Sequence, residues 1–336
     1  GSLYHSTTGV YNNGIMYDVI SIGTATRDVF LKSALFRTVH DPAHLEKLGF
    51  VTGEAQCVAL GGKVEIEAPV FTIGGGAANA ATTFARQGFK TAAFVSLGKD
   101  ENGRAIIEQL TREGADPLVH YDPKNKTAYS TILLSSSGER TILVYRGASE
   151  RLSVSSDIKK DLSTRAAYIA PGNISVSTIS SLMRELNAQG AYIAINPSKK
   201  YLELGIKKLG MILGLSDVVI MNREEASSLT GVNYEDVRGI FAKLDDVVRG
   251  IAIMTDGASG VWVSDGRVIF RAGTYKEKKL VDRTGSGDAF GSGFVAEILR
   301  GKNEAGMVSP EVLESAIRFG SPNATSVVEH IGAQEA

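Results

Sequence analysis

The segment with the strongest chemical signature covers residues 280–294 and reads LVDRTGSGDAFGSGF. Small residues at a turn before a helix can point successive backbone N–H groups into one concavity, where the helix dipole favours an anion such as phosphate. Asp288 would fall in the first helical turn, close enough to accept a proton from an attacking hydroxyl. The segment therefore indicates a phosphoryl-transfer centre. The alternative is a plain glycine-rich turn with Asp288 as a helix cap.

A second turn of small residues, IGGGAANAA, covers residues 73–81. Such a turn lets a polyhydroxylated ligand approach the backbone, and the Asn79 amide offers a donor and an acceptor to a diol. Asp28, after the first expected strand, would accept hydroxyl protons from a sugar. The alternatives are a glycine run that only eases packing and an aspartate that stabilises a turn.

Two further sites follow expected strands. Asn222 and Glu225 have the spacing of a capping box, and Glu225 is also placed to act on Mg²⁺ through water. The run from Thr255 to Gly260 joins two expected strands and would wrap a nucleotide with backbone groups, unless it is an ordinary hairpin turn. His40 and His44 lack a third ligand, so no metal site is expected there.

Composition narrows the class of protein. The chain has 336 residues, a formal charge of −1 and one cysteine, Cys57, so neither a nucleic-acid partner nor an intrachain disulfide is expected. The longest apolar stretch, 209–221, is shorter than the roughly 20 residues of a membrane helix. We expect a cytoplasmic protein without a membrane partner, with 1–16 as an N-terminal tail that begins in a cloning remnant. Walker-type, protein-kinase and dinucleotide signatures are missing from the sequence.

The elements that must position these residues alternate between short apolar runs and helical patterns. This alternation predicts an α/β fold with a mostly parallel sheet covered by helices on both faces. Several strands end in polar residues, and ligands bind at those carboxyl ends in open sheets. Residues 28–71 and 127–146 break the rhythm with strand-like hairpins, which predicts a small β-sheet lid. The expected strands are 17–22, 91–95, 166–169, 191–195, 218–221, 250–254 and 261–263, and the expected helices are 77–87, 103–113, 176–189, 223–229 and 237–248.

Taken together, GGGAAN at 74–79 and DRTGSGD at 282–288 resemble the two signatures of the ribokinase-like (PfkB) carbohydrate kinase family. Between them, Asn196-Pro197, the pair Asn222 and Glu225, and the Thr255 to Gly260 run appear in the order that this family uses. The resemblance covers the chain from Val19 onward. It implies one ribokinase-like three-layer domain, 17–336, with the lid over the site.

The resemblance also implies an activity: ATP- and Mg²⁺-dependent transfer of a phosphoryl group to a hydroxymethyl of a sugar or nucleoside. Asp288 matches the catalytic base, and the N–H groups of Gly285, Ser286 and Gly287 match the anion hole. Positions that match substrate-binding residues are Asp28, Gly75, Gly76 and Asn79, and Arg146 is expected to reach the site from the lid. Positions that match nucleotide-binding residues are Asn196, Asn222, Glu225, Thr255, Gly257 and Gly260.

Some family members use K⁺ beside the anion hole, and Asp282, Thr284 and the Gly332-Ala333-Gln334 run resemble that arrangement. The lid of relatives can serve as a dimer interface, so a homodimer through the lid is expected. Thr26 and Gly76 stand where ribokinases carry Asn and Lys, which argues against ribose itself. A sugar is the preferred acceptor. A nucleoside kinase and a catalytically silent nucleotide-binding module are the alternatives.

Overall fold

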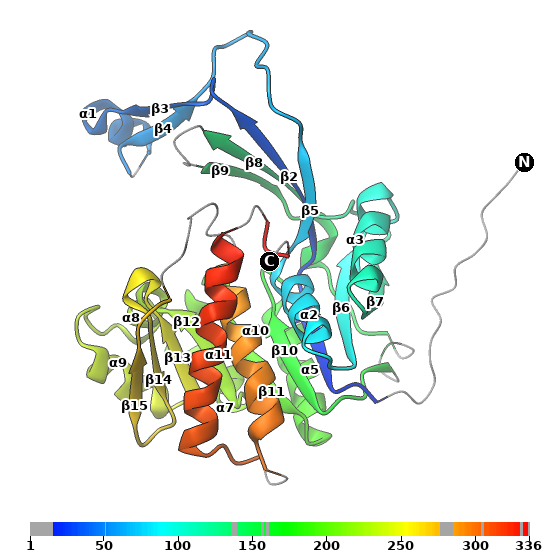
Figure 1. The fold of residues 1–336 in the computed structure, drawn as a ribbon, viewed down its shortest axis with the longest axis vertical. Helices are drawn as coiled ribbons and strands as arrows, with labels where there is room; N and C mark the ends of the chain where they lie inside the picture. Colours follow the sequence, from blue (N-terminus) through cyan, green and yellow to red (C-terminus); the bar gives the residue numbers. More distant parts are fainter. Residues whose placement is uncertain are drawn as a thin grey trace, which may run out of the picture.

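The computed structural model describes residues 16–50, 52–135, 140–155, 158, 161–275, 285–303, 306–329 and 332–334. A nine-stranded sheet forms its centre, in the order β15-β14-β13-β12-β11-β10-β1-β6-β7 (Figure 1). The strands from β7 to β13 are parallel, and β14 and β15 are added antiparallel at one edge. Their bounds are β1 Val19–Gly23, β6 Thr91–Leu97, β7 Ala115–Tyr121, β10 Ala166–Ala170, β11 Tyr192–Ile195, β12 Val218–Asn222, β13 Ile251–Thr255, β14 Val261–Ser264 and β15 Ile269–Ala272.

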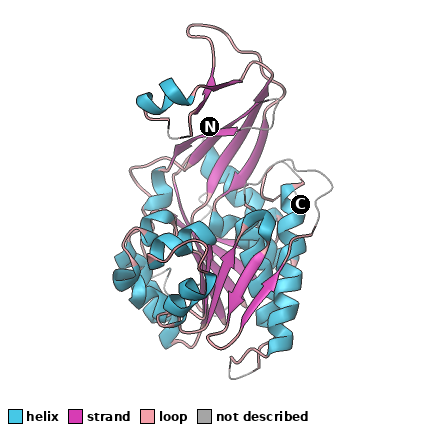
Figure 2. Ribbon diagram, turned by 90° about the vertical axis from the view of Figure 1, so that its left-hand side faces the viewer, coloured by secondary structure: helices cyan, strands magenta, loops and turns pink. Residues whose placement is uncertain are grey.

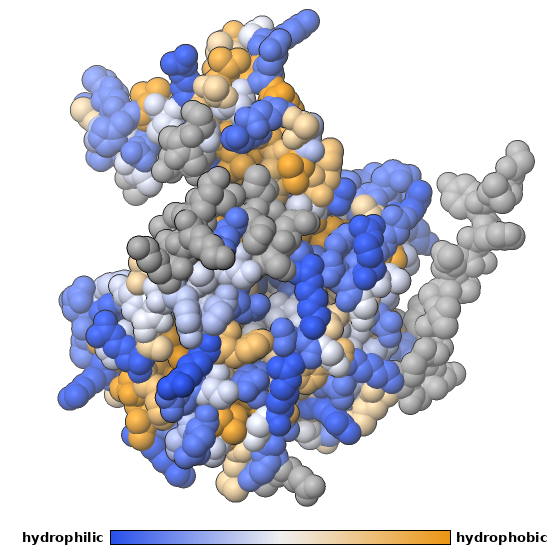
Figure 3. Space-filling view, viewed as in Figure 1, coloured by the Kyte–Doolittle hydropathy of each residue, from blue (hydrophilic) through white to orange (hydrophobic). Residues whose placement is uncertain are grey.

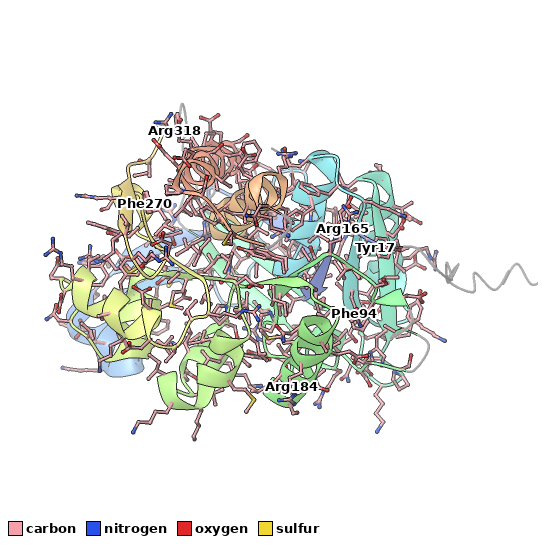
Figure 4. The ribbon with its side chains drawn as sticks, turned by 90° about the horizontal axis from the view of Figure 1, so that it is seen from below. Tyr17, Phe94, Arg165, Arg184, Phe270 and Arg318 are labelled. Carbon is pink, nitrogen blue, oxygen red and sulfur yellow. The ribbon has the colours of Figure 1, made fainter. Side chains whose placement is uncertain are left out.

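The sheet is buried on both faces, which explains its continuous apolar strands. Alternate residues face opposite layers: Ile20 and Ile193 join one core cluster, and Val19 and Ala194 join the other. Seen from below, Arg318 on α11 and Arg184 on α5 lie on opposite sides of the sheet (Figure 4). One layer holds α2 Gly76–Arg86, α3 Glu101–Arg112, α10 Ser286–Gly301 and α11 Pro310–Val328; the other holds α5 Val176–Ala188, α6 Lys199–Leu202, α7 Ile206–Gly214, α8 Arg223–Thr230 and α9 Val237–Asp245.

A four-stranded sheet in the order β5-β2-β8-β9 stands above the carboxyl ends of the central strands (Figures 1 and 2). Its strands are β2 Thr26–Ser33, β5 Val70–Gly74, β8 Tyr129–Ser135 and β9 Arg140–Tyr145. β2 pairs with β5 antiparallel and with β8 parallel. The expected small sheet is therefore confirmed. Strand β2 begins at Thr26 and its partner β5 ends at Gly74, so both extend slightly beyond the predicted range of 28–71.

The expectation of one extended hairpin between 28–36 and 50–71 is wrong in detail. Between β2 and β5 the chain forms a separate two-stranded sheet, β3 Arg37–His40 with β4 Glu54–Cys57, capped by α1 Pro42–Leu45 and the short 3-10 helix η1 Glu46–Leu48. Pro42 at the start of α1 and the acceptor Asp41 before it favour this helix, and the alternating strand pattern hid both. His40 and His44 contact Glu54 and Asp41 there.

Most other element boundaries lie close to those predicted from the sequence. The unpredicted elements discussed below carry residues that weaken a strand or helix pattern. Strand β7 and helices α7 and α11 were not predicted from the sequence. Strand β7 carries Asp116 and Pro117, which is possible because it is the edge strand. Helix α11 contains Pro322 and α7 contains Gly210, residues that weaken a helical pattern.

Candidate active site

The N-terminus of α10 is open toward the lid side of the sheet. Gly285 is its N-cap residue with φ of 80°, a left-handed conformation that favours glycine, and no side chain caps the helix. A Cβ on Gly285 would overlap the side chain of Ala333. The helix begins at Ser286, so Asp288 lies in its first turn as the sequence predicted. Since no side-chain cap is present, this is the end of α10 at which the helix dipole favours an anion, and the role of Gly285, Ser286 and Gly287 as an anion hole stays a prediction.

Asp288 is anchored from another helix. The Asn79 Nδ2 group on α2 donates to Asp288 Oδ2 over 3.0 Å. Burial raises the pKa of the Asp288 carboxyl, and the hydrogen bond from Asn79 opposes that rise only in part. A raised pKa moves a carboxylate toward the range in which it serves as a general base.

Gly76 lies beside this carboxylate. A Cβ on Gly76 would come 3.4 Å from Asp288 Oδ1 and 2.6 Å from the Cβ of Ala170. Glycine at this position therefore keeps open the approach to the carboxylate. The two signature turns, separated in sequence by about two hundred residues, meet at Asp288.

The turn before α2 differs from the turn before α10 because its N–H groups already have partners. Thr24, at the end of β1, accepts from Gly76 N through Oγ1 at 3.1 Å and from Ala77 N through its carbonyl at 3.1 Å. Gly75, with φ of 93°, approaches the Thr24 carbonyl closely. The helix N-terminus available to an anion is therefore that of α10. The sequence analysis missed Thr24, although it stands at the carboxyl end of a central strand.

Asp28 is not a turn residue, so the alternative of a turn-stabilising role is wrong. It lies in β2 of the lid, opposite Thr72 of β5, and its Oδ1 accepts from Thr26 Oγ1 at 2.8 Å. A Cβ on Gly74 would overlap Asp28 Oδ2. Asp28 thus lies in the first strand of the lid sheet, and its role toward a ligand stays a prediction.

Arg146 lies at the return from the lid to the central sheet. Its side chain is 55% exposed and stands 3.6 Å from Glu150 Oε1. Glu150 also accepts from Asn173 Nδ2, beyond the end of β10, over 2.7 Å. Glu150 was missed by sequence analysis, although the polar residues 171–173 marked this strand end. Arg27 on β2 donates to the Thr72 carbonyl and stacks on Phe71.

A cavity of about 210 Å³ adjoins the α10 N-terminus. It brings together the loop after β13 and the anion-binding turn, which are the two segments expected to hold a nucleotide. Its α11 wall combines apolar and hydroxyl side chains, and several glycines line the β13 loop and the start of α10. The lining residues are Thr255, Gly257, Ala258, Gly260, Val261, Gly273, Thr274, Tyr275, Ser286, Gly287, Phe290, Ser321, Ala324, Thr325 and Val328.

Asn222 and Glu225 form the predicted capping box. Asn222 Oδ1 accepts from Glu225 N at 2.8 Å, and Glu225 Oε2 accepts from Asn222 N at 2.9 Å. Burial raises the pKa of Glu225. One carboxylate oxygen is thus committed to the helix, and within the described ranges no group of three acidic, histidine or cysteine side chains gathers. These residues fit Mg²⁺ only through water and phosphate oxygens, which is how Mg²⁺ is usually held in kinases.

Asn196 follows the neighbouring strand β11. Burial and the Asp288 carboxylate raise the pKa of the Tyr168 hydroxyl on β10, and Asn196 lowers it. Asp282 and Thr284, expected near a K⁺ ion, lie outside the described residues. Gln334 Oε1 and Thr72 Oγ1 are buried without a hydrogen-bond partner in the described part of the chain.

Comparison with solved structures identifies the class of fold. The ribokinase of Arabidopsis thaliana, solved with ribose and ATP, superposes with a TM-score of 0.75 over 95% of both chains at 20% identity. The architecture is therefore the ribokinase fold.

The family follows from the sequence. Residues 43–336 match the model of the pfkB family carbohydrate kinases. The probable fructokinase-7 of Arabidopsis thaliana is 30% identical over 253 residues, 70% of this chain and 73% of that protein. The cytidine kinase of Thermococcus kodakarensis is 28% identical over 266 residues, 77% of this chain and 88% of that protein. The chain belongs to the pfkB family of carbohydrate kinases, a family of ATP-dependent sugar and nucleoside kinases that typically require Mg²⁺.

Proposed function

We propose that this protein transfers the γ-phosphoryl group of ATP to a hydroxymethyl group of a sugar, with Asp288 as the general base. The observation that carries the proposal is the position of Asp288. Its carboxylate lies in the first turn of a helix without a side-chain cap and is anchored by Asn79, and the preceding Ser286 and Gly287 line a cavity that reaches the β13 loop. A general base, a helix N-terminus that favours an anion and an adjoining cavity for the nucleotide are what phosphoryl transfer requires.

The roles divide by element. Asp288 accepts the proton of the attacking hydroxyl, and the N–H groups of Gly285, Ser286 and Gly287 hold the charge that develops on the transferred phosphoryl group. Thr255, Gly257 and Gly260 line the nucleotide cavity. Asn196 and Asn222, at the ends of adjacent strands, lie toward the phosphates.

Glu225 would hold Mg²⁺ through water, because one of its oxygens serves the capping box. Bound Mg²⁺ neutralises the phosphate oxygens as charge develops. A K⁺ site formed by Asp282 and Thr284 beside the anion hole is part of the proposal. The unpartnered oxygens of Gln334 and Thr72 support it.

The acceptor would bind between the lid and the α2 turn. Asp28 would accept from its hydroxyls, Gly75 and Gly76 would let it approach Asp288, and Asn79 and Arg146 would complete the polar lining. Thr26 already donates to Asp28.

A nucleoside acceptor is the second candidate, because the similar Thermococcus kodakarensis protein is named a cytidine kinase. The insertion between β2 and β5 is the segment that would have to enclose a bulkier acceptor. It forms its own sheet with β3 and β4, separate from the lid sheet (Figure 1). This arrangement favours the sugar.

The lid also suggests an assembly. Apolar side chains gather on the lid sheet, where Val70, Phe71 and the range 142–145 are exposed (Figure 3). We propose that 17–336 is one kinase domain and that a second copy of the chain covers the lid. Size-exclusion chromatography with light scattering tests this, and Leu143→Glu would yield monomers. A monomeric wild-type protein would contradict it.

The described part of the chain contains no helix long and apolar enough to cross a membrane. A cytoplasmic location, where ATP and reduced thiols are abundant, is our proposal. It is supported by the single exposed Cys57.

The function is tested by ADP release with Mg-ATP, with and without K⁺, against pentoses, hexoses, their monophosphates and nucleosides. Turnover with a sugar supports the proposal and identifies the acceptor. Turnover with nucleosides alone would replace it with the second candidate. Tight ATP binding without turnover on any acceptor would contradict both and favour a silent nucleotide-binding module.

A further inference from the structure

A buried chain of hydrogen bonds leads away from Asp288 to a residue that does not touch the cavity. Asn79 Nδ2 donates to Asp288, and Asn79 Oδ1 accepts from Gln334 Nε2 over 3.1 Å. Gln334 is 3% exposed and Asn79 is 8% exposed. Both ends of the Asn79 amide are therefore committed to protein partners in a site with little water.

An asparagine amide has two orientations that differ by exchange of its oxygen and nitrogen. Only one of them donates to Asp288, because the other would place Oδ1 against a carboxylate oxygen. Gln334 donates to Asn79 Oδ1, so it favours the productive orientation. If Gln334 lost its donor, the two orientations would differ less in energy, and Asp288 would lose part of its anchor.

The backbone around Gln334 is held by contacts that do not use its side chain. Arg86 donates to the Gln334 carbonyl over 2.7 Å and pairs with Glu113 over 2.8 Å. Ala333 packs against Gly285, and a Cβ on Gly332 would come 3.0 Å from Thr72 Cγ2. Removing the Gln334 amide should therefore leave residues 332–334 in place between α2, α10 and β5.

We infer that Gln334 is a positioning residue of the transfer reaction, acting through Asn79 to orient the Asp288 carboxylate. The inference rests on the proposed function, in which Asp288 is the base. A packing role would need only the volume of the Gln334 side chain. The positioning role needs its amide donor, and the effect on Asp288 must pass through Asn79.

The proposed role of Gln334 should be visible in the pKa of the Asp288 carboxyl. The groups facing Asp288 in the described residues are Asn79 from α2 and the Tyr168 hydroxyl from β10, and Arg86 with Glu113 lie behind Gln334. Asn79 lowers the pKa of Asp288 against the rise caused by burial. Loss of the Asn79 donor raises that pKa further, so the acid limb of the rate profile moves to higher pH.

The experiment is a double-mutant cycle with Gln334→Leu, Asn79→Ala and the double variant. The first readout is the titration of the Asp288 carboxyl carbon by NMR in protein labelled at aspartate, assigned with Asp288→Asn. The second is kcat and KM with the acceptor identified by the ADP-release panel. Gln109→Leu is the matched control, because Gln109 donates to Glu113 and touches no residue of the site.

We expect Gln334→Leu to raise the pKa of Asp288 by about half a unit to one unit. The rate constant kcat should fall about tenfold, with KM for ATP unchanged. The double variant should titrate as Asn79→Ala does alone, and Gln109→Leu as the wild type. Additive shifts, or an unchanged pKa in Gln334→Leu, would overturn the inference.

Two further measurements distinguish the donor role of Gln334 from a packing role and from a cation role. Gln334→Glu keeps the shape of the side chain but, when ionised, cannot donate to Asn79, so it should raise the pKa at least as much as Gln334→Leu. It serves in place of Gln334→Leu if that variant does not fold. Repeating the assays at saturating K⁺ should leave the defect intact, and rescue by K⁺ would show a cation role instead. If the wild type shows no turnover on any acceptor, the proposed function fails, while the titration still decides the Gln334 question.

Discussion

Asn79 and Asp288, 209 positions apart in the sequence, meet through a hydrogen bond of 3.0 Å between the first turns of two helices. One helix follows β5 of the lid sheet, and the other lies against α11 on the same face of the central sheet. The contact fixes the only carboxylate to which we assign a chemical step. It also links the lid, through β5 and α2, to the anion-binding end of α10.

The pH dependence of activity should follow Asp288. Because burial holds its pKa above the ordinary value for aspartate, kcat should fall as the pH drops through that raised pKa, when the base becomes protonated. The rate profile of the wild type, measured at saturating ATP, tests this. An acid limb at the pKa of an ordinary exposed aspartate would contradict it.

The raised pKa of Asp288 also predicts a cost in stability: the ionised carboxylate that serves as the base lowers the free energy of unfolding. A carboxyl whose pKa is raised on folding binds protons more tightly in the native state, so its ionisation destabilises the fold at neutral pH. Asp288→Asn should therefore be more stable than the wild type above the raised pKa. The difference should shrink as the pH falls toward the unfolded-state pKa. Urea unfolding at a series of pH values measures it, and a difference that does not vary with pH would exclude this cause.

Gly285→Ala should damage both stability and turnover. The left-handed backbone costs about 1–2 kcal/mol for an L side chain, and the new Cβ would also overlap Ala333. Moving the anion-binding N–H groups should lower kcat by on the order of 100-fold. Gly266→Ala is the matched control, since Gly266 has the same φ of 80° with nothing within 4 Å of a Cβ. Equal loss of activity in both variants would contradict the role of Gly285.

The Glu225→Gln variant separates the capping role of Glu225 from the role of its negative charge. A glutamine can still accept from Asn222 N, so the free energy of unfolding should change by less than about 0.5 kcal/mol. Glu225→Ala removes the cap as well and should cost about 1 kcal/mol. If Glu225 acts on Mg²⁺ through water, both variants should need more Mg²⁺ for half-maximal activity. An unchanged Mg²⁺ titration in Glu225→Gln would limit Glu225 to its structural role.

Arg223 braces the nucleotide loop from α8. It donates to Asp256 Oδ2 over 2.9 Å and stacks at 4.1 Å on Tyr234. Arg223→Met would leave the largely buried Asp256 carboxylate without its cationic partner, with the Tyr234 hydroxyl still donating to Oδ1, at a cost of about 3 kcal/mol, and should raise KM for ATP roughly tenfold. Arg318→Met, which breaks an exposed pair with Glu314, should change neither quantity. An unchanged KM for ATP in Arg223→Met would contradict a bracing role.

The elements that carry the site were largely predictable from sequence. Asn222, Glu225 and Asp288 each stand at a helix start with a local signal, a cap or a small-residue turn, and each lies where that signal predicted. Alternating apolar runs likewise predicted the parallel sheet, because strands buried on both faces leave a continuous apolar pattern.

Long-range contacts were not predictable in the same way. No local pattern indicates that Thr24 would cap α2, or that Gln334 would reach Asn79. Asp28 was open to assignment as a turn residue because the pairing of β2 with β5 and β8 depends on residues far away in the sequence. The hairpin of β3 and β4 was hidden because alternation predicts strands and does not predict their partners.

The central claim, that Asp288 is the base of phosphoryl transfer, is tested most directly by Asp288→Asn. Turnover should be measured with the identified acceptor and ATP binding by calorimetry, with Asp246→Asn at the end of α9 as control. The account predicts that kcat falls by a factor on the order of 10² to 10⁴ while the Kd for ATP changes little. Turnover in Asp288→Asn close to that of the wild type and of Asp246→Asn would contradict it.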